Sequence, residues 1–420
     1  MHTAPKSLRL QIGIFGRTNV GKSSFLNMVA GQEVAITSPV PGTTTDVVEK
    51  AMELPPVGPV VFLDTGGIDD GSELGARRID RTRRVFDRSD VSILILAADE
   101  WTPYEDEVVR EAEVRKSPLI LVVNKCDVRR PSPVFLDKLR AKTPRVMICA
   151  STDRAVREAP VNLLKQYLLE VCPKDYLATP VLLGDIMPRG GLAVLIIPID
   201  FEAPKGRIIL PQVQAIRDAL DHGSMTLVVR ESECKAALAR LKSVPDLVVC
   251  DSQVVDRMVA ETPAEVKCTT FSILFSRLKG DIVEMTRGAL AIKDLRPGDK
   301  VLISESCSHH AIDGDIGRIK IPAWLRKYLG RDVTVRVAAG RDFPPDVGDY
   351  KLIIQCGSCM LTRRETLARI QRAKQAGVPI TNYGLCISYL QGVLDRVIEP
   401  FADAKAVFKN KGKGRGEEIC

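Results

Sequence analysis

The first 175 residues alternate between short apolar segments and amphipathic ones. Residues 8–15 alternate apolar with other side chains and predict a strand, whereas apolar spacing over 24–30 predicts a helix. Further apolar runs predict strands at 60–63, 119–123 and 146–151. Strands that alternate with helices in this way are typical of a sheet covered by helices.

Two later stretches of the chain repeat this alternation on a smaller scale. In the first, strands are predicted at 194–199, 225–229 and 246–250, and helices at 212–220, 231–241 and 251–260. In the second, strands are predicted at 300–304, 333–338, 350–355 and 378–381, and helices at 271–279, 281–287, 363–376 and 387–398. Each stretch therefore predicts a small α/β domain with a mostly parallel sheet.

Helix ends and changes of composition set the expected domain boundaries. A proline after the last helix of the first domain places its end near residue 175. We expect an N-terminal domain over 1–175, a middle domain over 176–263 and a C-terminal domain over 264–408. Residues 409–420 are basic, Gly-rich and unable to bury a core, so we expect them to form a disordered tail.

Composition narrows the class of protein. With 420 residues, of which 45% are hydrophobic, the chain is long enough for several cores. The net charge of +7 arises from 60 basic against 53 acidic residues, which is weak evidence for nucleic-acid binding, and we expect none. The chain has no signal-peptide core and no apolar run of about 18 residues, which indicates a cytoplasmic protein without a membrane span. Eleven cysteines in such a chain favour reduced thiols or metal ligands over disulfides.

The most specific motif lies between the first predicted strand and the first predicted helix. Residues 16–23 read GRTNVGKS and match the phosphate-binding loop G-x-x-x-x-G-K-S. Backbone N–H groups of such a loop surround phosphate oxygens, Lys22 reaches the β and γ phosphates, and the Ser23 hydroxyl ligates Mg2+. The residues that we expect to contact the nucleotide here are Gly16, Asn19, Val20, Gly21, Lys22, Ser23 and Ser24.

Later motifs indicate that the nucleotide is GTP. Residues 64–67 follow a strand and match D-x-x-G, in which the aspartate holds Mg2+ through water and the glycine N–H bonds the γ phosphate. Residues 124–127 read NKCD and match N-K-x-D, whose carboxylate, Asp127, accepts two guanine N–H groups that adenine lacks. The expected nucleotide contacts in these segments are Asp64, Gly67, Asn124, Lys125, Asp127 and, at the end of the strand over 146–151, Ala150.

Residues 41–45, which read PGTTT, lie where a threonine completes the Mg2+ shell in switch I. The residues expected to act in hydrolysis are therefore Lys22, Thr45, Asp64 and Gly67. In this order, the motifs resemble those of the TrmE–Era-like GTPases over roughly residues 8–172. The resemblance implies that Asn19 ligates a potassium ion, although Asn19 could instead only cap the loop. Ile68 stands where Ras-like enzymes carry a water-positioning glutamine, so we expect slow intrinsic hydrolysis.

A second group of candidate ligands follows two predicted strands of the C-terminal domain. Cys307 and His309 come just after the strand at 300–304, and Cys356 and Cys359 just after the strand at 350–355. If these strands are neighbours, their carboxyl ends bring the side chains together, as is usual for ligands of open α/β sheets. The residues alone leave three chemistries open: a redox dithiol, a zinc site with three cysteines and a histidine, and an iron–sulfur cluster with three cysteine ligands.

A G domain joined to C-x-H and C-x-x-C motifs resembles the HydF family, the GTPases of FeFe-hydrogenase maturation, over essentially the whole chain. The resemblance implies a scaffold or carrier that holds or delivers the two-iron subcluster precursor of the hydrogenase. It implies a 4Fe–4S cluster bound by Cys307, Cys356 and Cys359, in addition to GTP, Mg2+ and K+. It also implies a homodimer joined by the middle domain, with radical-SAM maturases and the apo-hydrogenase as partners.

The fourth iron of such a cluster would accept an exchangeable ligand. The candidates in this chain are His309, His310, Glu305 or an exogenous group, and His309 could instead orient the site without ligating it. Two other interpretations compete with this family. An RNA-associated GTPase of the Era or EngA type needs a GxxG loop, but residues 314–317 match it with an aspartate that would repel phosphates. A signalling GTPase with a structural zinc is the other, and metal analysis separates it from an iron–sulfur protein.

Overall fold

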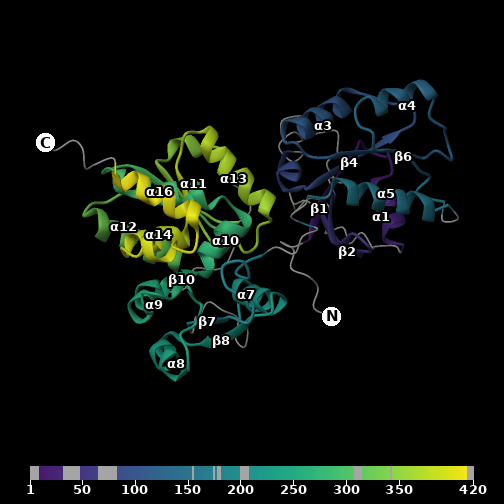
Figure 1. Ribbon diagram of the computed structural model, residues 1–420. Helices are drawn as coiled ribbons and strands as arrows, with labels where there is room; N and C mark the ends of the chain where they lie inside the picture. Colours follow the sequence, from purple (N-terminus) through teal and green to yellow (C-terminus); the bar gives the residue numbers. More distant parts are fainter. Residues whose placement is uncertain are drawn as a thin grey trace. The chain divides into compact units, whose positions relative to one another are not determined.

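The computed structural model describes residues 9–31, 48–64, 83–153, 156–173, 176, 181–198, 208–306, 315–340 and 343–413. The chain forms two compact units, Met1–Thr179 and Pro180–Cys420, and each is an α/β structure (Figure 1). No helix within the described ranges combines the length and the apolar character needed to cross a membrane.

The N-terminal unit is built on a six-stranded sheet of order β2-β3-β1-β4-β5-β6. Every neighbouring pair is parallel except β2 with β3. The strands are β1 (Leu10–Phe15), β2 (Val48–Leu54), β3 (Gly58–Asp64), β4 (Val91–Ala97), β5 (Leu119–Asn124) and β6 (Val146–Ile148). The helices that position the site are α1 (Lys22–Ala30), α3 (Pro103–Val114), α4 (Pro133–Arg140) and α5 (Glu158–Val171).

Helices cover both faces of this sheet, which explains why β4 and β5 read as nearly continuous apolar runs, whereas β1 alternates in sequence although all of its residues are buried. Phe25 of α1 and Leu164 of α5 belong to the apolar core on one face. Val108 of α3 and Leu139 of α4 belong to the core on the other face. Strands buried on both faces read as continuous apolar runs instead of alternating ones. The α/β fold predicted for this part of the chain is therefore confirmed.

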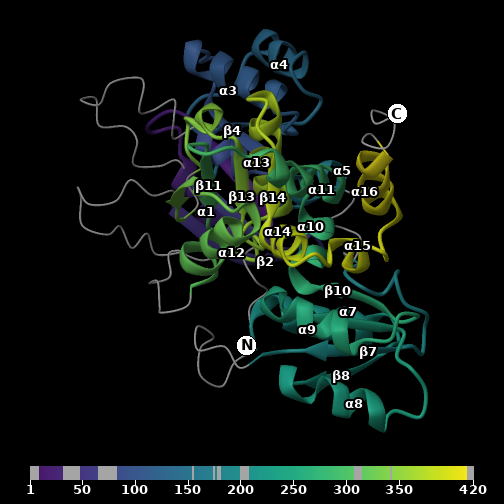
Figure 2. The same ribbon diagram turned by 90° about the vertical axis from the view of Figure 1, so that its left-hand side faces the viewer.

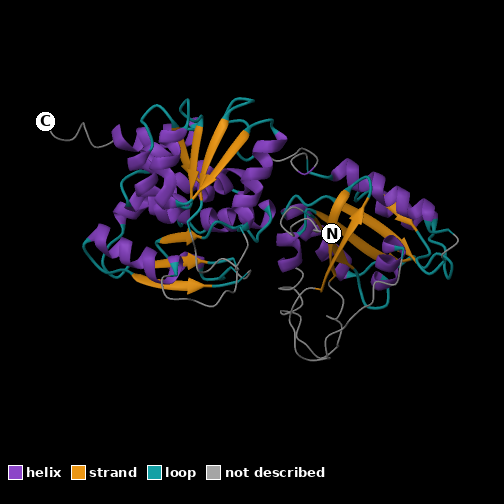
Figure 3. Ribbon diagram, turned by 90° about the horizontal axis from the view of Figure 1, so that it is seen from below, coloured by secondary structure: helices purple, strands orange, loops and turns teal. Residues whose placement is uncertain are grey.

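The C-terminal unit contains two parallel four-stranded sheets, whose strands run in different directions (Figure 3). The middle sheet has the order β10-β9-β7-β8, with β7 (Leu192–Ile196), β8 (Met225–Val229), β9 (Leu247–Cys250) and β10 (Lys267–Thr270). The second sheet has the order β12-β11-β13-β14, with β11 (Lys300–Ser304), β12 (Thr334–Ala338), β13 (Leu352–Gln355) and β14 (Ile380–Asn382).

Helices α7 (Leu210–Asp221), α8 (Cys234–Arg240) and α9 (Val255–Glu261) accompany the middle sheet. Helices α10 (Phe271–Lys279), α11 (Ile282–Leu290), α12 (Ile321–Leu329), α13 (Arg363–Gln375), α14 (Tyr383–Leu390), α15 (Leu394–Val397) and α16 (Ala402–Lys413) follow. Helix α10 lies between the two sheets, in contact with α7 on one side and with α13 and α14 on the other (Figure 2). A single apolar core runs through both sheets, which makes this half of the chain one compact unit.

Strand β10 corrects the domain boundary expected from the sequence. Its residues pair with β9, for example Cys268 with Val248, so the middle sheet continues beyond residue 263. The boundary expected at 263/264 therefore falls before the last strand of the middle sheet. The sequence did not predict β10 because its four residues, KCTT, carry almost no apolar signal.

Two helices also differ from their predicted extents. The helix predicted at 387–398 is divided into α14 and α15, because Gly392 between them adopts a left-handed φ of 74° and ends the first helix. Helix α16 continues to Lys413 and so includes residues 409–413, which the sequence assigned to a disordered tail. Residues 414–420 of that tail lie outside the described residues.

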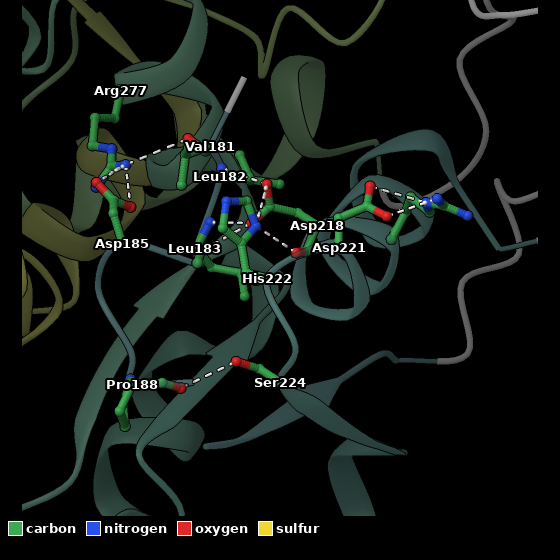
Figure 4. Close-up of polar contacts among 12 residues, drawn as sticks. Val181, Leu182, Leu183, Asp185, Pro188, Asp218, Asp221, His222, Ser224 and Arg277 are labelled. Carbon is green, nitrogen blue, oxygen red and sulfur yellow. Dashed lines mark hydrogen bonds and ion pairs between the residues drawn. The ribbon is translucent and has the colours of Figure 1, made fainter. Parts of the chain in front are cut away.

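A buried carboxylate anchors the beginning of the C-terminal unit to α7 (Figure 4). The Asp218 carboxylate accepts backbone N–H bonds from Leu182, Leu183 and Gly184 at 2.8–2.9 Å. Arg277 of α10 holds the same segment by donating to both carboxylate oxygens of Asp185, at 2.6 and 2.7 Å. Through these contacts, the segment that leads into the middle sheet is bound to both α7 and α10, which fixes its position relative to α10.

Candidate functional site

The phosphate-binding loop leaves the carboxyl end of β1 and enters α1, as the motif predicts. Two of its residues adopt left-handed backbone conformations, Asn19 with φ 63° and Gly21 with φ 93°. The Lys22 ammonium lies over the loop and donates to the carbonyl oxygens of Gly16 and Arg17, at 2.8 and 2.9 Å. The loop therefore curls around the lysine that the motif assigns to the phosphates.

The two motif glycines are required by packing as well as by the phosphates. A Cβ on Gly21 would stand 2.3 Å from the Asn124 amide nitrogen at the end of β5. A Cβ on Gly16 would stand 2.6 Å from the Ile95 carbonyl oxygen of β4. Since atoms cannot approach so closely, only glycine allows the loop to rest on the neighbouring strand ends.

Asn124, the first residue of N-K-x-D, joins the phosphate loop to the loop after β6. Its amide nitrogen donates to the Val20 carbonyl oxygen at 3.0 Å, and its amide oxygen accepts from the Ser151 N–H at 3.1 Å and from the Ser151 hydroxyl at 2.5 Å. The side chain is only 1% exposed. The nucleotide contact expected of Asn124 from the sequence stays a prediction, and the structure adds that the same side chain joins these two loops.

The other predicted guanine contacts lie at the same edge of the sheet. Lys125 and Asp127 are exposed just after β5, and Ala150 is half-buried after β6. The two segments are held together by the Cys126 N–H, which donates to the Cys149 carbonyl oxygen at 3.2 Å. The structure thus brings the phosphate loop, N-K-x-D and Ala150 to one end of the sheet.

The predicted Mg2+ residues are only partly described. Asp64 is the last residue of β3, where it is buried and in register with Ile14 of β1. Ser23 and Ser24 are half-buried in the first turn of α1. Thr45, Gly67 and Ile68 lie outside the described residues.

Sequence reasoning missed the residues of α3 that support the phosphate loop. The Arg17 guanidinium donates to Glu105 at 2.9 Å and to Glu100 at 2.6 Å, and the Tyr104 hydroxyl accepts from the Gly16 N–H at 3.2 Å. Burial alone lowers the pKa of Arg17, but its hydrogen bonds to the two glutamates outweigh this effect and raise it. The only signal in the sequence is T-x-x-E, a capping box in which Glu105 bonds the Thr102 N–H at 2.7 Å.

At the second candidate site, the structure confirms that the two strands preceding the cysteine motifs are neighbours. Strands β11 and β13 pair in parallel, and the Cys356 N–H continues the ladder by donating to the Ser304 carbonyl oxygen at 3.0 Å. The Ser306 N–H lies 3.2 Å from the Cys356 sulfur, and the Ser306 hydroxyl lies 3.0 Å from it. Cys307, which follows Ser306, lies outside the described residues, as do His309 and His310.

The C-x-x-C loop is held from inside by a lysine. Lys279, at the end of α10, is 3% exposed. Its ammonium donates to the carbonyl oxygens of Ser358 at 3.3 Å, Cys359 at 3.1 Å and Leu361 at 2.9 Å. Burial lowers the pKa of Lys279 to about 8, although the nearby Cys359, Glu365 and Cys356 oppose the shift. Burial raises the pKa of the Cys359 thiol, and Lys279 opposes that shift.

Glu305, a candidate fourth ligand, lies at the same sheet edge. It is buried, and its carboxylate pairs with Arg318 at 3.2 Å. The described residues contain no group of three or more cysteine, histidine or acidic side chains arranged to hold a metal ion. The predicted set of Cys307, Cys356 and Cys359 includes one cysteine outside that range.

Three family models match the chain. Residues 11–125 match the 50S ribosome-binding GTPase model. Residues 182–280 match the hydrogen maturase F dimerization domain, and residues 283–400 match the hydrogen maturase F tetramerization domain. The first of these matches identifies a GTPase domain within the N-terminal unit.

Two curated relatives each match part of the chain. The tRNA modification GTPase MnmE of Synechococcus sp. strain JA-2-3B'a(2-13) is 40% identical over 162 residues, and that of strain JA-3-3Ab is 44% identical over 163 residues. Each match covers 37% of this chain and 34% of the relative, so the chain spans about a third of the length of these curated relatives. Among solved structures, Aquifex aeolicus Era bound to GDP and aluminium fluoride is 18% identical, with a TM-score of 0.31, over 79% of this chain and 92% of that one.

The two matches beyond the GTPase domain identify the family. The two hydrogen maturase F models follow one another without overlap and together cover more than half of the chain. Their junction, between residues 280 and 283, falls directly after α10 and not at the expected 263/264. With a GTPase domain ahead of both models, the chain belongs to the hydrogen maturase F family of TrmE–Era-like GTPases.

Proposed function

We propose that this protein is a GTP-hydrolysing scaffold that binds a 4Fe–4S cluster and holds or delivers the two-iron precursor during FeFe-hydrogenase maturation. The observation that carries the proposal is the parallel pairing of β11 with β13, which sets Cys356 against the residue preceding Cys307. Its partners would be the radical-SAM maturases and the apo-hydrogenase. The tRNA modification named for MnmE remains a property of those relatives.

The residues around the C-x-x-C loop fit an anionic cluster with thiolate ligands. Cys307, Cys356 and Cys359 would hold the cluster, which would supply an iron site with an exchangeable ligand. The Ser306 N–H and hydroxyl lie within hydrogen-bonding distance of the Cys356 sulfur, where they would stabilise a thiolate. Arg318 pairs with one oxygen of the Glu305 carboxylate, so Glu305 would offer its other oxygen to iron. The fourth ligand would be Glu305, His309, His310 or an exogenous group.

Iron and zinc analysis after anaerobic reconstitution tests the cluster. We expect about four irons for each wild-type chain and an EPR signal after dithionite reduction, as for a 4Fe–4S cluster. Replacing Cys307, Cys356 or Cys359 by serine should abolish the signal. Cys126→Ser is the matched control, because Cys126 is also a partly exposed free cysteine but lies in the GTPase domain. One zinc for each chain and no cluster signal would contradict the proposal and favour a structural metal.

In the GTPase domain, we propose that Lys22, Thr45, Asp64 and Gly67 serve the γ phosphate and Mg2+, and that Asp127 recognises guanine. Asn124 supports binding as a tether, since it ties the phosphate loop to the loop that carries Ala150. This role does not involve contact with the γ phosphate, so loss of the Asn124 side chain should weaken the binding of GTP and GDP equally.

Asn124→Ala tests this tether. The substitution leaves the Val20 carbonyl and the Ser151 N–H without their buried partner, at a cost of about 1–3 kcal/mol. If this cost destabilises the loop conformation that binds nucleotide, fluorescence titrations should show affinity weakened by roughly 5- to 150-fold, equally for GTP and GDP. Asn162→Ala, at an exposed position of α5, is the control and should change nothing. Unchanged affinity in Asn124→Ala would rule out the tether.

Potassium is the second proposal for this site. Asn19 is exposed at the tip of the phosphate loop, and amide oxygens suit hard cations. Replacing Na+ by K+ should raise the GTP hydrolysis rate several-fold in the wild type and in Asn162→Ala, but not in Asn19→Ala. Equal rates in the two salts would leave Asn19 with a role in loop conformation alone.

We also propose that β8 joins two copies of the chain, in line with the dimerization model matched by this region. Strand β8 ends the middle sheet, and within the described residues no strand pairs with its outer edge. The Met225 N–H and the Val229 carbonyl bond inward to β7, so the backbone groups of Thr226 and Val228 point outward. Val228 is also 43% exposed.

Val228→Pro removes an outward N–H without breaking a bond to β7. We expect light scattering coupled to size exclusion to show a smaller species, with GTP hydrolysis retained as evidence that the GTPase domain is intact. Val228→Thr keeps the N–H and a branched side chain, and should elute as the wild type. The same mass for Val228→Pro and wild type would place the interface elsewhere.

A further inference from the structure

Lys279 is a buried cation whose hydrogen-bond acceptors are all neutral. Its ammonium donates to three carbonyl oxygens, those of Ser358, Cys359 and Leu361. It also lies 5.2 Å from the centre of the Phe275 ring, within the range of a cation–π contact. Carbonyl dipoles and an aromatic face orient a charge but do not neutralise it, and a buried charge without a counter-charge is costly. The acidic groups that favour its charge are Glu365 and, once ionised, the thiols of Cys359 and Cys356.

The three acceptors belong to one short stretch of chain, and that stretch contains the C-x-x-C motif. Ser358 within it adopts a left-handed φ of 54°, a conformation that non-glycine residues seldom take. The Gln355 amide donates to the Ser358 hydroxyl at 2.5 Å and supports the same turn from β13. A turn of this kind persists where the surrounding contacts determine it, and the ammonium supplies three of them.

The lysine does not belong to the domain whose loop it holds. Lys279 is the last residue of α10, which follows β10 of the middle sheet and lies within the matched dimerization domain. Two residues earlier on α10, Arg277 is bound to Asp185 at the start of the middle domain (Figure 4). The anchor of the cysteine loop is thus tied to the middle domain.

We propose that Lys279 is a positioning residue that shapes the C-x-x-C loop from the middle domain and provides a fixed positive charge beside the iron–sulfur cluster. The second part of this inference, the positive charge beside a cluster, rests on the proposed function. Three hydrogen bonds hold the loop in its left-handed turn whether or not a cluster is bound. With a cluster present, its negative charge adds to that of Glu365 and faces the ammonium from the cysteine side of the loop.

Two variants separate these effects. Lys279→Met keeps the length of the side chain but removes both the donors and the charge. Lys279→Gln removes the charge but keeps N–H donors, on a shorter side chain that can reach fewer of the three carbonyl oxygens. Lys267→Met is the matched control, because Lys267 also donates to a carbonyl oxygen, that of Ile186 at 3.2 Å, but lies on β10 away from the cysteine loop.

The first readout uses metal-free protein and does not depend on the cluster. In Lys279→Met, loss of the cation by itself raises the pKa of the Cys359 thiol and slows its alkylation, whereas opening of the loop exposes both thiols. We expect the opening to dominate, so that Cys356 and Cys359 react with iodoacetamide roughly tenfold faster, which corresponds to about 1.4 kcal/mol of lost loop stability. Hydrogen exchange of residues 356–362 should rise with it, while exchange in the middle sheet stays as in the wild type and shows that the variant is folded. Lys279→Gln should fall between the wild type and Lys279→Met.

The second readout is the midpoint potential of the reconstituted cluster. Removing a positive charge disfavours the reduced, more negative state, so both Lys279 variants should shift the potential to more negative values. Lys267→Met should leave the potential and the alkylation rate unchanged. Wild-type alkylation and exchange in Lys279→Met would overturn the positioning role, and an unchanged potential in both variants would overturn the charge. If wild-type protein binds no cluster, the proposed function fails, and the metal-free readout still decides the role of Lys279 in the loop.

Discussion

Parallel pairing of strands is the constraint on which both sites depend. Parallel neighbours point their carboxyl ends to the same edge of a sheet, so loops far apart in the sequence meet there. In the N-terminal unit this places the loop after β1 beside Asn124 at the end of β5. In the C-terminal unit it places Cys356 beside Ser306, 50 positions away. A shift of one strand register would separate these groups, since each step moves the following loop by about 3.3 Å.

Three buried polar side chains each hold a segment of irregular backbone in a defined position. Asn124 connects two loops of the GTPase domain, Asp218 gathers three backbone N–H groups of the middle domain, and Lys279 gathers three carbonyl groups of the cysteine loop. In each case one side chain satisfies several backbone groups that would otherwise be buried without partners, and leaving such a group unpaired costs about 1–3 kcal/mol. The loops that carry function are therefore held by a few contacts of high individual cost, not by an extensive apolar core of their own.

The same reasoning explains why overall charge says little about this chain. The net charge of +7 is a small excess among many charged side chains, and ion pairs at exposed positions, such as Arg326 with Asp332, are worth roughly 0–1 kcal/mol. The charged side chains that determine the shape of the functional loops are buried. Glu105 is fully buried, pairs with Arg17 and caps α3, and thereby fixes the phosphate loop from the side. Lys279 does the equivalent for the cysteine loop with neutral acceptors, which leaves its charge to act on whatever the thiols bind.

The sequence by itself determined the classes of chemistry and the alternation of elements. Motifs such as GRTNVGKS and NKCD act over a few residues, and apolar strands covered on both faces leave a signal that any window of the chain contains. The tertiary structure decided what depends on distant partners: that β10 completes the middle sheet, that Asn124 lies between two loops, that Glu105 supports Arg17, and that Lys279 reaches a loop about 80 positions later. A short strand of mixed residues, or one lysine at a helix end, has no local pattern that distinguishes it. Its role arises from the pairing of strands and the packing of helices, because only these bring the donor and its acceptors together.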